Sequence, residues 1–153
     1  MQLRDLHSKP GHLIRRAQQI AVAIFTEECA GFDLTPVQYA ALVAIRENPG
    51  TDATRLSALI AFDRSTLGNV LERLEARKLV TRYPSPEDKR IKLLKLSASG
   101  SALVKRAQAS VERAQERILA PLKPADRKKF MDLLSQMVEL NNDASRVPQR
   151  LAG

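Results

Sequence analysis

The residues with the clearest chemical capacity follow Asp63. An aspartate ahead of a helical pattern is a favourable N-cap, and apolar residues then recur at the spacing of one helix face as far as Leu74. Arginine and asparagine can contact base edges, hydroxyls can reach phosphate oxygens, and short side chains allow close approach to a groove. The sequence therefore predicts a helix that reads the DNA major groove through five outward-facing residues: Arg64, Ser65, Thr66, Asn69 and Arg73.

A second basic group follows at Lys89 and Arg90. The flanking segments 79–83 and 91–96 have the composition of short strands, whereas the two prolines within 84–88 exclude regular structure. These segments predict a β-hairpin with both cations near its tip. An arginine on such a protruding loop can enter a minor groove, whose negative potential attracts cations. Without the preceding helix, the same pattern would be interpreted as an ordinary solvated hairpin tip.

Basic charge is concentrated around these two groups. The chain has 153 residues and a formal net charge of +8. Between Arg55 and Lys95 there are ten Lys or Arg and five Asp or Glu, a difference of +5. This concentration favours a polyanionic partner. A basic surface that serves only solubility is the alternative that charge alone leaves open.

Helical patterns surround this region. Residues 51–62 begin with cap-type residues and continue with apolar positions at helical spacing, so a short helix precedes the reading helix. The run Thr35-Pro36-Val37-Gln38 is a capping box with proline at the first helical position, and it predicts a helix that ends near Asn48. Residues 1–9 are expected to be frayed.

Three longer amphipathic helices are predicted outside this module, over residues 12–29, about 97–120 and 124–141. Lys123 is a poor N-cap for the last of them, because its side chain cannot accept a hydrogen bond. Together they carry more apolar surface than a small winged module can cover, so we expect a dimer interface. The alternative is that they fold back on their own subunit. The predicted fold is mainly α with a small β-hairpin wing, a winged helix-turn-helix dimerised through its N- and C-terminal helices.

Several functional classes are disfavoured by composition. The single cysteine, Cys29, excludes an intramolecular disulfide framework and a cysteine-based zinc site. The chain lacks an apolar run of membrane-spanning length and an N-terminal signal core, so a soluble cytoplasmic protein is expected. The only histidines are His7 and His12, and there is no glycine-rich phosphate loop and no catalytic or metal-ligand spacing. We therefore expect no enzyme activity, no cofactor and no metal.

The order of elements and two motifs resemble the MarR family of bacterial winged helix-turn-helix regulators. The more specific motif is Asp88-Lys89-Arg90 followed by Leu94-Lys95-Leu96-Ser97-Ala98-Ser99-Gly100, similar to the family pattern D-x-R, a strand, then L-[TS]-x-x-G. The segment 71–80 resembles L-x-x-L-E-x-x-G-L-[VI] at the end of the reading helix. Lys78 stands where this pattern has glycine, so the helix end must adopt a left-handed or alternative geometry with a side chain present.

The resemblance implies one MarR-type domain over residues 1–153. Its DNA-binding part covers about residues 35–100, and its dimerisation helices cover 10–30 and 100–145. It further implies a homodimer that presents two winged modules to successive major grooves of a pseudo-palindromic operator, usually as a repressor. Lys89 and Arg90 then serve the wing, and Asp88 braces Arg90.

Members of this family usually respond to a small aromatic or phenolic acid. In this chain the candidate effector-binding residues are His12, Arg15, Arg16 and Gln19, with Tyr39 facing them from the helix that begins at the Thr35 capping box. His12, Arg16 and Gln19 share one helix face, and such a cluster can hold a carboxylate and hydrogen-bond a ring substituent. Arginines that face solvent or pair across the dimer are the alternative.

Two other functions remain open at this point. A thiol-based redox regulator would use Cys29, although Glu27, Glu28 and the nearby helix C-terminus all disfavour a thiolate. An architectural DNA-binding protein without an effector would show the same charge and the same wing.

Overall fold

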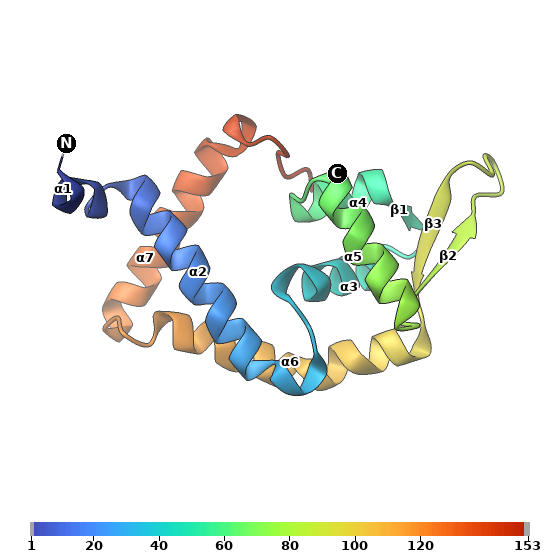
Figure 1. Ribbon diagram of the computed structural model, residues 1–153, viewed down its shortest axis with the longest axis horizontal. Helices are drawn as coiled ribbons and strands as arrows, with labels where there is room; N and C mark the ends of the chain where they lie inside the picture. Colours follow the sequence, from blue (N-terminus) through green and yellow to red (C-terminus); the bar gives the residue numbers. More distant parts are fainter. Residues whose placement is uncertain (1, 152–153) are drawn as a thin grey trace.

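The computed structural model describes residues 2–151, and most of them are helical (Figure 1). The helices are α1 (Leu3–His7), α2 (Pro10–Glu28), α3 (Pro36–Glu47), α4 (Ala53–Ile60), α5 (Arg64–Ala76), α6 (Ala98–Leu119) and α7 (Pro124–Leu140), with short 3-10 turns at Ala30–Phe32 and Asn142–Ala144. The strands are β1 (Thr51–Asp52), β2 (Val80–Pro84) and β3 (Lys92–Leu96). The expected fold, mainly α with a small wing, is confirmed. None of the helices within residues 2–151 is long and apolar enough to cross a membrane.

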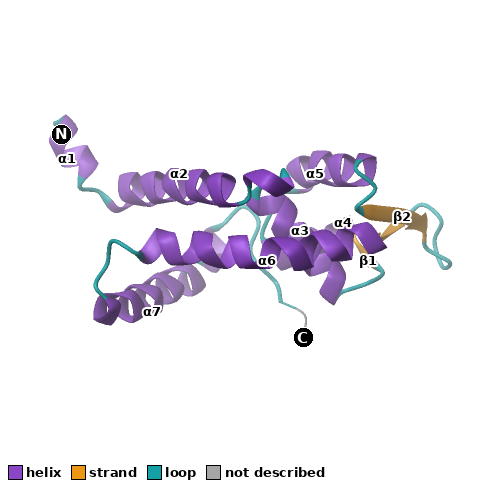
Figure 2. Ribbon diagram, turned by 90° about the horizontal axis from the view of Figure 1, so that it is seen from below, coloured by secondary structure: helices purple, strands orange, loops and turns teal. Residues whose placement is uncertain are grey.

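The elements form two parts joined by α6. The reading head, defined as α3, α4, α5 and the sheet, lies at one end, and α1, α2 and α7 lie at the other (Figure 1). Figure 2 shows α2 and α6 lying side by side. Ion pairs hold the end of α2 to α6, since Glu28 lies 3.2 Å from Arg113 and 2.7 Å from Arg117. The hydrogen bonds from Arg117 and then Arg113 lower the pKa of Glu28.

The wing is a three-stranded antiparallel sheet in the order β1-β3-β2. Strands β2 and β3 pair from Val80 opposite Leu96 to Pro84 opposite Lys92, close to the segments that the sequence predicts. The third strand, β1, pairs Thr51 with Leu94 and was not predicted. Two residues are too few to show an alternating pattern. They also directly precede α4, for which Asp52 is the N-cap.

Local hydrogen bonds define the starts of the helices in the reading head. The side chains of Thr35 and Gln38 form the predicted capping box at the start of α3. Asp63 caps α5 as expected, accepting from the Thr66 amide at 2.9 Å. Lys123 makes no side-chain cap bond at the start of α7, in agreement with the sequence-based expectation.

The end of α5 has a left-handed backbone conformation at Lys78, one of the two geometries expected from the sequence. Lys78 has a φ of 58°, in the left-handed region. The Lys78 amide donates to the Glu75 carbonyl at 2.8 Å and the Leu79 amide donates to the Leu74 carbonyl at 3.0 Å, which together make a Schellman motif. A side chain in this conformation costs about 1–2 kcal/mol relative to glycine. The reading helix therefore ends as in the family pattern, although without the glycine.

One hydrophobic core serves the reading head and the adjoining halves of two long helices. It runs from Phe25 and Cys29 at the end of α2, through α3, α4, α5 and the wing, to Ala114 in α6. By contrast, α7 has no buried residue and α2 has only Phe25. The outer end of this chain is therefore not packed against a core of its own.

The expectation that residues 1–9 are frayed is wrong for Leu3–His7. These residues form α1, whose side chains are exposed. The Gln2 amide donates to the Asp5 carboxylate at 2.9 Å and the Asp5 amide donates to the Gln2 carbonyl at 3.0 Å, and these bonds support its first turn. The sequence pattern missed this helix because five residues are too few to show a repeating apolar face. Met1, Ala152 and Gly153 lie outside the described residues.

Gly100 occupies a position that no other residue fits. A Cβ atom there would lie 2.2 Å from the Leu79 carbonyl oxygen. We predict that Gly100→Ala lowers the free energy of unfolding by about 1–3 kcal/mol, because the first turn of α6 must move away from the reading head. Urea denaturation followed by circular dichroism measures the change.

The matched control is Gly68→Ala in α5, where a Cβ would meet nothing within 4 Å. That change should raise stability by about 0.5–1 kcal/mol, since alanine is the better helix former. Equal stability of Gly100→Ala and the wild type would show that α6 does not pack on Leu79 as described.

Candidate nucleic-acid interface

One side of α5 presents an exposed polar stripe. Ser65, Asn69 and Arg73 follow at four-residue intervals, so they lie on one line along the helix, and all three are exposed. The other side of α5 is buried in the core through Leu67, Val70, Leu71 and Leu74. The apolar periodicity therefore placed this stripe correctly, and it leaves a continuous surface of hydroxyl, amide and guanidinium groups.

The two remaining candidates on α5 already have partners within the reading head. Arg64 donates to the Thr54 hydroxyl of α4. The Thr66 hydroxyl donates to the Asp63 carboxylate at 2.9 Å, in addition to the backbone cap. These bonds from Thr66 lower the pKa of Asp63, and the positive charge of Arg146 lowers it further. Arg64 and Thr66 thus help to hold the start of α5 while remaining exposed.

The far end of α5 is also held by polar contacts. Arg77 donates to the carbonyl oxygens of Asp33 at 2.6 Å and Phe32 at 3.0 Å. Arg82 of β2 lies 3.2 Å from the Glu75 carboxylate, which ties the wing to the helix. The reading helix is therefore fixed at both ends, and its polar stripe has a defined orientation relative to the wing.

At the wing tip, Asp88 holds Arg90. The Asp88 carboxylate accepts from the Arg90 amide at 3.0 Å and from the guanidinium at 3.1 and 3.0 Å. These bonds, the side-chain bond first, lower the pKa of Asp88. The Arg90 side chain is nevertheless 91% exposed. A guanidinium has five N–H donors, so this bidentate interaction orients the Arg90 side chain and leaves donors for an external acceptor.

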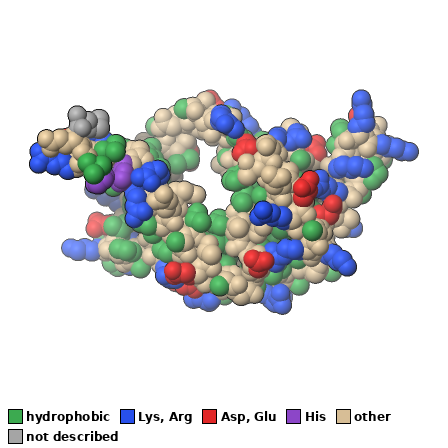
Figure 3. Space-filling model, in the orientation of Figure 1, with side chains coloured by type: hydrophobic (Ala, Val, Ile, Leu, Met, Phe, Trp, Pro, Cys, Tyr) green, Lys and Arg blue, Asp and Glu red, His purple; other side chains and the backbone are tan. Residues whose placement is uncertain are grey.

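The loop that carries this pair is closed by backbone bonds. The Ser85 amide donates to the Ile91 carbonyl at 2.8 Å, and the Ile91 amide donates to the Asp88 carbonyl at 2.9 Å. Lys89 is exposed at the same tip. Figure 3 shows Lys and Arg side chains gathered on the wing. The wing is therefore a basic projection of defined shape.

The candidate effector residues of α2 form two local pairs. Arg15 lies 3.3 Å from the Nδ1 atom of His12, and Arg16 donates to Gln19 at 2.9 Å. The partial burial of His12 and then the charge of Arg15 lower the pKa of His12, which favours its neutral form. The arginines and Gln19 are exposed. This part of α2 therefore offers two guanidinium groups and a neutral imidazole.

Tyr39 does not join this group within one chain. Its ring centroid lies 6.3 Å from that of Phe25, near the other end of α2. At a helical rise of about 1.5 Å per residue, Phe25 is roughly 13 Å along the axis from Arg16. Sequence spacing could not reveal this separation, because it depends on where α3 crosses α2.

We call α1, α2 and α7 the outer helices. A cavity of about 380 Å³ lies between two of them, α2 and α7, and the reading head. It is lined by Ile14, Ala61, Met137, Val138, Asn141, Asn142, Ser145, Val147 and Gln149. None of the five candidate effector residues lines it, although Ile14 is on the same helix. The side-chain amides of Asn141, Asn142 and Gln149 in this cavity were not predicted from the sequence, because the cavity arises only when the C-terminal segment folds back. Figure 3 shows an opening in this region, between the outer helices and the reading head.

Cys29 is fully buried at the end of α2. Burial raises the pKa of the Cys29 thiol, and the carboxylate of Glu28 raises it further. Both effects favour the unreactive thiol over the thiolate. Within residues 2–151 there is also no group of three or more His, Cys, Asp or Glu side chains arranged to hold a metal ion.

Comparisons with known proteins agree with this geometry. A model of the MarR family matches residues 32–91, from the turn before α3 to the wing. The chain is 31% identical to the HTH-type transcriptional repressor NicR of Pseudomonas putida over 140 residues, which cover 92% of this chain and 89% of that relative.

Two solved structures share the fold. One is BpsR of Bordetella bronchiseptica, whose DNA binding is regulated by 6-hydroxynicotinic acid. It has a TM-score of 0.79 and 34% identity, covering 86% of this chain and 94% of that one. The other is the transcriptional repressor CouR bound to a 23-mer DNA duplex, with a TM-score of 0.80 and 28% identity, covering 90% and 98% of the two chains.

The burial of Cys29 predicts slow reaction with a thiol reagent. We expect the native protein to react with 5,5′-dithiobis(2-nitrobenzoic acid) at least about a hundredfold more slowly than the same protein in denaturant, because the thiol is both inaccessible and protonated. The release of thionitrobenzoate measures the rate, and Cys29→Ser is the blank. If the thiol reacted equally fast in the native and in the denatured protein, Cys29 would be a candidate redox sensor.

Proposed function

This chain belongs to the MarR family, and from that premise we propose that it is a sequence-specific DNA-binding transcriptional repressor released by a small aromatic acid. The observation that carries the proposal is the polar stripe of α5 beside a wing whose Arg90 is held by Asp88. Such a protein is a regulator and not an enzyme, and it would act in the cytoplasm, where the bacterial chromosome lies.

The two parts of the reading head would contact DNA differently. Ser65, Asn69 and Arg73 present donors and acceptors suited to base edges in a major groove. Arg64 and Thr66, which are already bonded within the head, are better suited to backbone phosphates than to bases. Arg90, with Lys89, would lie in the adjacent minor groove, where the negative potential favours an oriented cation.

We propose that the working unit is a homodimer. The outer helices expose large apolar side chains, among them Leu133 and Val138, each 56% exposed. A second copy supplies a matching surface by two-fold symmetry. The domain would then divide as the sequence predicts, with residues of about 35–100 reading DNA and 10–30 and 100–145 forming the interface. Two heads related by a two-fold axis fit half-sites about 34 Å apart.

The effector would bind at the exposed cluster of candidate residues on α2, which lies outside the cavity between α7 and the reading head. BpsR responds to 6-hydroxynicotinic acid, which joins a carboxylate to a polar aromatic ring. In this chain Arg15 and Arg16 can bind the carboxylate, and His12 and Gln19 can bind ring substituents. Tyr39 is too far from them within one chain to share the same ligand unless the partner chain supplies it. Binding releases DNA only if the ligand favours one head separation over another.

The two alternatives have weaker support. Redox regulation through Cys29 is opposed by the burial and raised pKa of the thiol. An architectural protein without an effector would bind DNA equally well in the presence of every aromatic acid. Release of DNA by an aromatic acid therefore distinguishes the repressor from the architectural protein.

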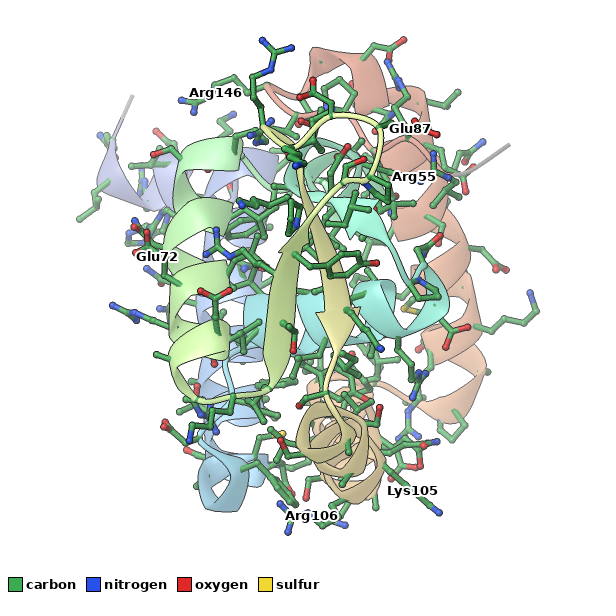
Figure 4. The ribbon with its side chains drawn as sticks, turned by 90° about the vertical axis from the view of Figure 1, so that its right-hand side faces the viewer. Arg55, Glu72, Glu87, Lys105, Arg106 and Arg146 are labelled. Atoms are coloured by element: carbon green, nitrogen blue, oxygen red, sulfur yellow. The ribbon has the colours of Figure 1, made fainter. Side chains whose placement is uncertain are left out.

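The wing assignment predicts that Arg90→Ala weakens DNA binding on the order of tenfold or more, because each dimer loses two oriented cations. The probe is a duplex selected from a random-sequence library by the wild-type protein, and fluorescence anisotropy at physiological salt gives the Kd. Lys105→Ala is the control, because Lys105 is exposed on α6 on the side of the molecule opposite the wing residue Glu87 (Figure 4). Equal affinity of Arg90→Ala and the wild type would remove the wing from the interface.

The effector assignment predicts a shift in the response to an aromatic acid. We expect 6-hydroxynicotinic acid or 4-hydroxybenzoic acid to release the wild type from the selected duplex. Arg16→Ala should need roughly tenfold more acid, because a charge-assisted bond to the carboxylate is lost. Arg4→Ala in α1 is the control. An unchanged half-maximal concentration in Arg16→Ala would exclude this residue, and no release of the wild type by any aromatic acid tested would favour the architectural alternative.

A further inference from the structure

The C-terminal segment of the chain returns to the reading head. After α7 the described backbone crosses to the end of α4 (Figure 1). The Arg150 amide donates to the Ala58 carbonyl at 2.9 Å, and the Gln149 side chain donates to the Leu59 carbonyl at 3.0 Å. We call residues 142–151 the strap.

The strap satisfies polar groups that α4 leaves open. The last four carbonyl groups of a helix have no partner within that helix. In α4 the Ser57 carbonyl accepts from Ala61 and Phe62, whereas the Ala58 and Leu59 carbonyls accept from the strap. The strap therefore provides donors for two of the last four carbonyl groups of α4, the first helix of the helix-turn-helix.

The strap also has internal bonds that define its path. The Gln149 amide donates to the Asn142 side chain at 2.9 Å, and the Asn142 side chain donates to the Gln149 carbonyl at 3.1 Å. Arg150 forms an ion pair with Asp143 at 2.8 Å. These bonds close a loop from residue 142 to residue 150, so the backbone between these two residues follows a fixed path.

Arg146 lies in that loop and points away from it. Its side chain is exposed and makes no hydrogen bond or ion pair with any of residues 2–151. Its charge nevertheless acts on Asp63, the N-cap of α5. Figure 4 shows Arg146 at the same end of the molecule as Arg55 and the wing residue Glu87, and opposite Lys105 and Arg106. An unpaired cation thus lies next to the start of the reading helix.

We propose that the strap is part of the DNA-binding surface and that it places Arg146 against a backbone phosphate beside the major groove read by α5. The proposal rests on the function proposed above. Such a contact adds affinity without sequence preference, and neutralising a phosphate releases a counterion. It also links the end of α7 in the outer part to the DNA surface through one short loop.

The test compares Arg146→Gln with the matched variant Arg106→Gln, which removes the same charge from the opposite end of the molecule. Affinity is measured by fluorescence anisotropy at several salt concentrations. The probes are the duplex selected by the wild-type protein and a random-sequence duplex of the same length. Arg146→Gln should lower the affinity for both duplexes on the order of tenfold. It should also reduce the slope of log K against log salt by about 1.8, or about 0.9 for each of two copies. Arg106→Gln should change neither quantity.

A second variant tests whether the strap positions Arg146. Gln149→Ala removes the bond to Leu59 and keeps the Arg146 charge, so it should weaken binding in the wild type and have little further effect in Arg146→Gln, because both changes act on one contact. Wild-type affinity and salt slope in Arg146→Gln, or fully additive effects of the two variants, would overturn the proposal. Failure of the wild type to select any duplex would instead overturn the proposed function.

Discussion

The structure depends on the apolar surface of the outer helices, which one chain leaves in contact with water. On α2 the exposed side chains include Leu13, Ile14 and Ile20, and on α7 they include Phe130, Leu133 and Val138. Moving one such side chain fully out of water is worth about 1.5–3 kcal/mol. A soluble chain rarely leaves several such side chains exposed on adjacent helices. The two-fold association proposed here removes that cost, and it brings two reading heads into one particle.

The connection between the outer helices and the reading heads is stiff. The core of each head continues into α6 as far as Ala114, and Glu28 joins α2 to Arg113 and Arg117 of the same helix. At the other end of α6, the Ser97 hydroxyl donates to the Lys78 carbonyl at 2.7 Å and accepts from the Gly100 amide at 3.0 Å. In the proposed dimer, movement of α2 or α6 at the interface would therefore be carried to the end of the reading helix. An effector that changes the packing of the outer helices can change the head separation without touching DNA.

Local chemistry made much of the fold and part of the site predictable. The caps of Thr35 and Asp63 depend on neighbouring residues, and the stripe of α5 depends on helical period alone. The contact between Asp88 and Arg90 was expected only from the family resemblance, and the structure supplies its geometry. The same resemblance marked Gly100 as diagnostic, and the Leu79 carbonyl supplies the physical reason.

Apart from the short helix α1, the features that sequence reasoning missed join distant parts of the chain. Strand β1 forms only when residue 51 meets residue 94, and this pairing gives β3 its second partner. Tyr39 was assigned to a cluster from which the crossing of α3 and α2 separates it. Arg146 gained a potential role only because residues 149 and 150 bond to α4, some 90 positions earlier. Periodicity and capping carry no information about such contacts.

In the proposed dimer, two copies of this chain share the apolar faces of α2 and α7. Sedimentation equilibrium of the wild-type protein at micromolar concentration, without DNA or effector, tests this association. We predict a single species with twice the chain mass of 17.0 kDa. A species of 17.0 kDa over the same concentration range would contradict the proposed dimer, because the outer helices would then be stable in water alone.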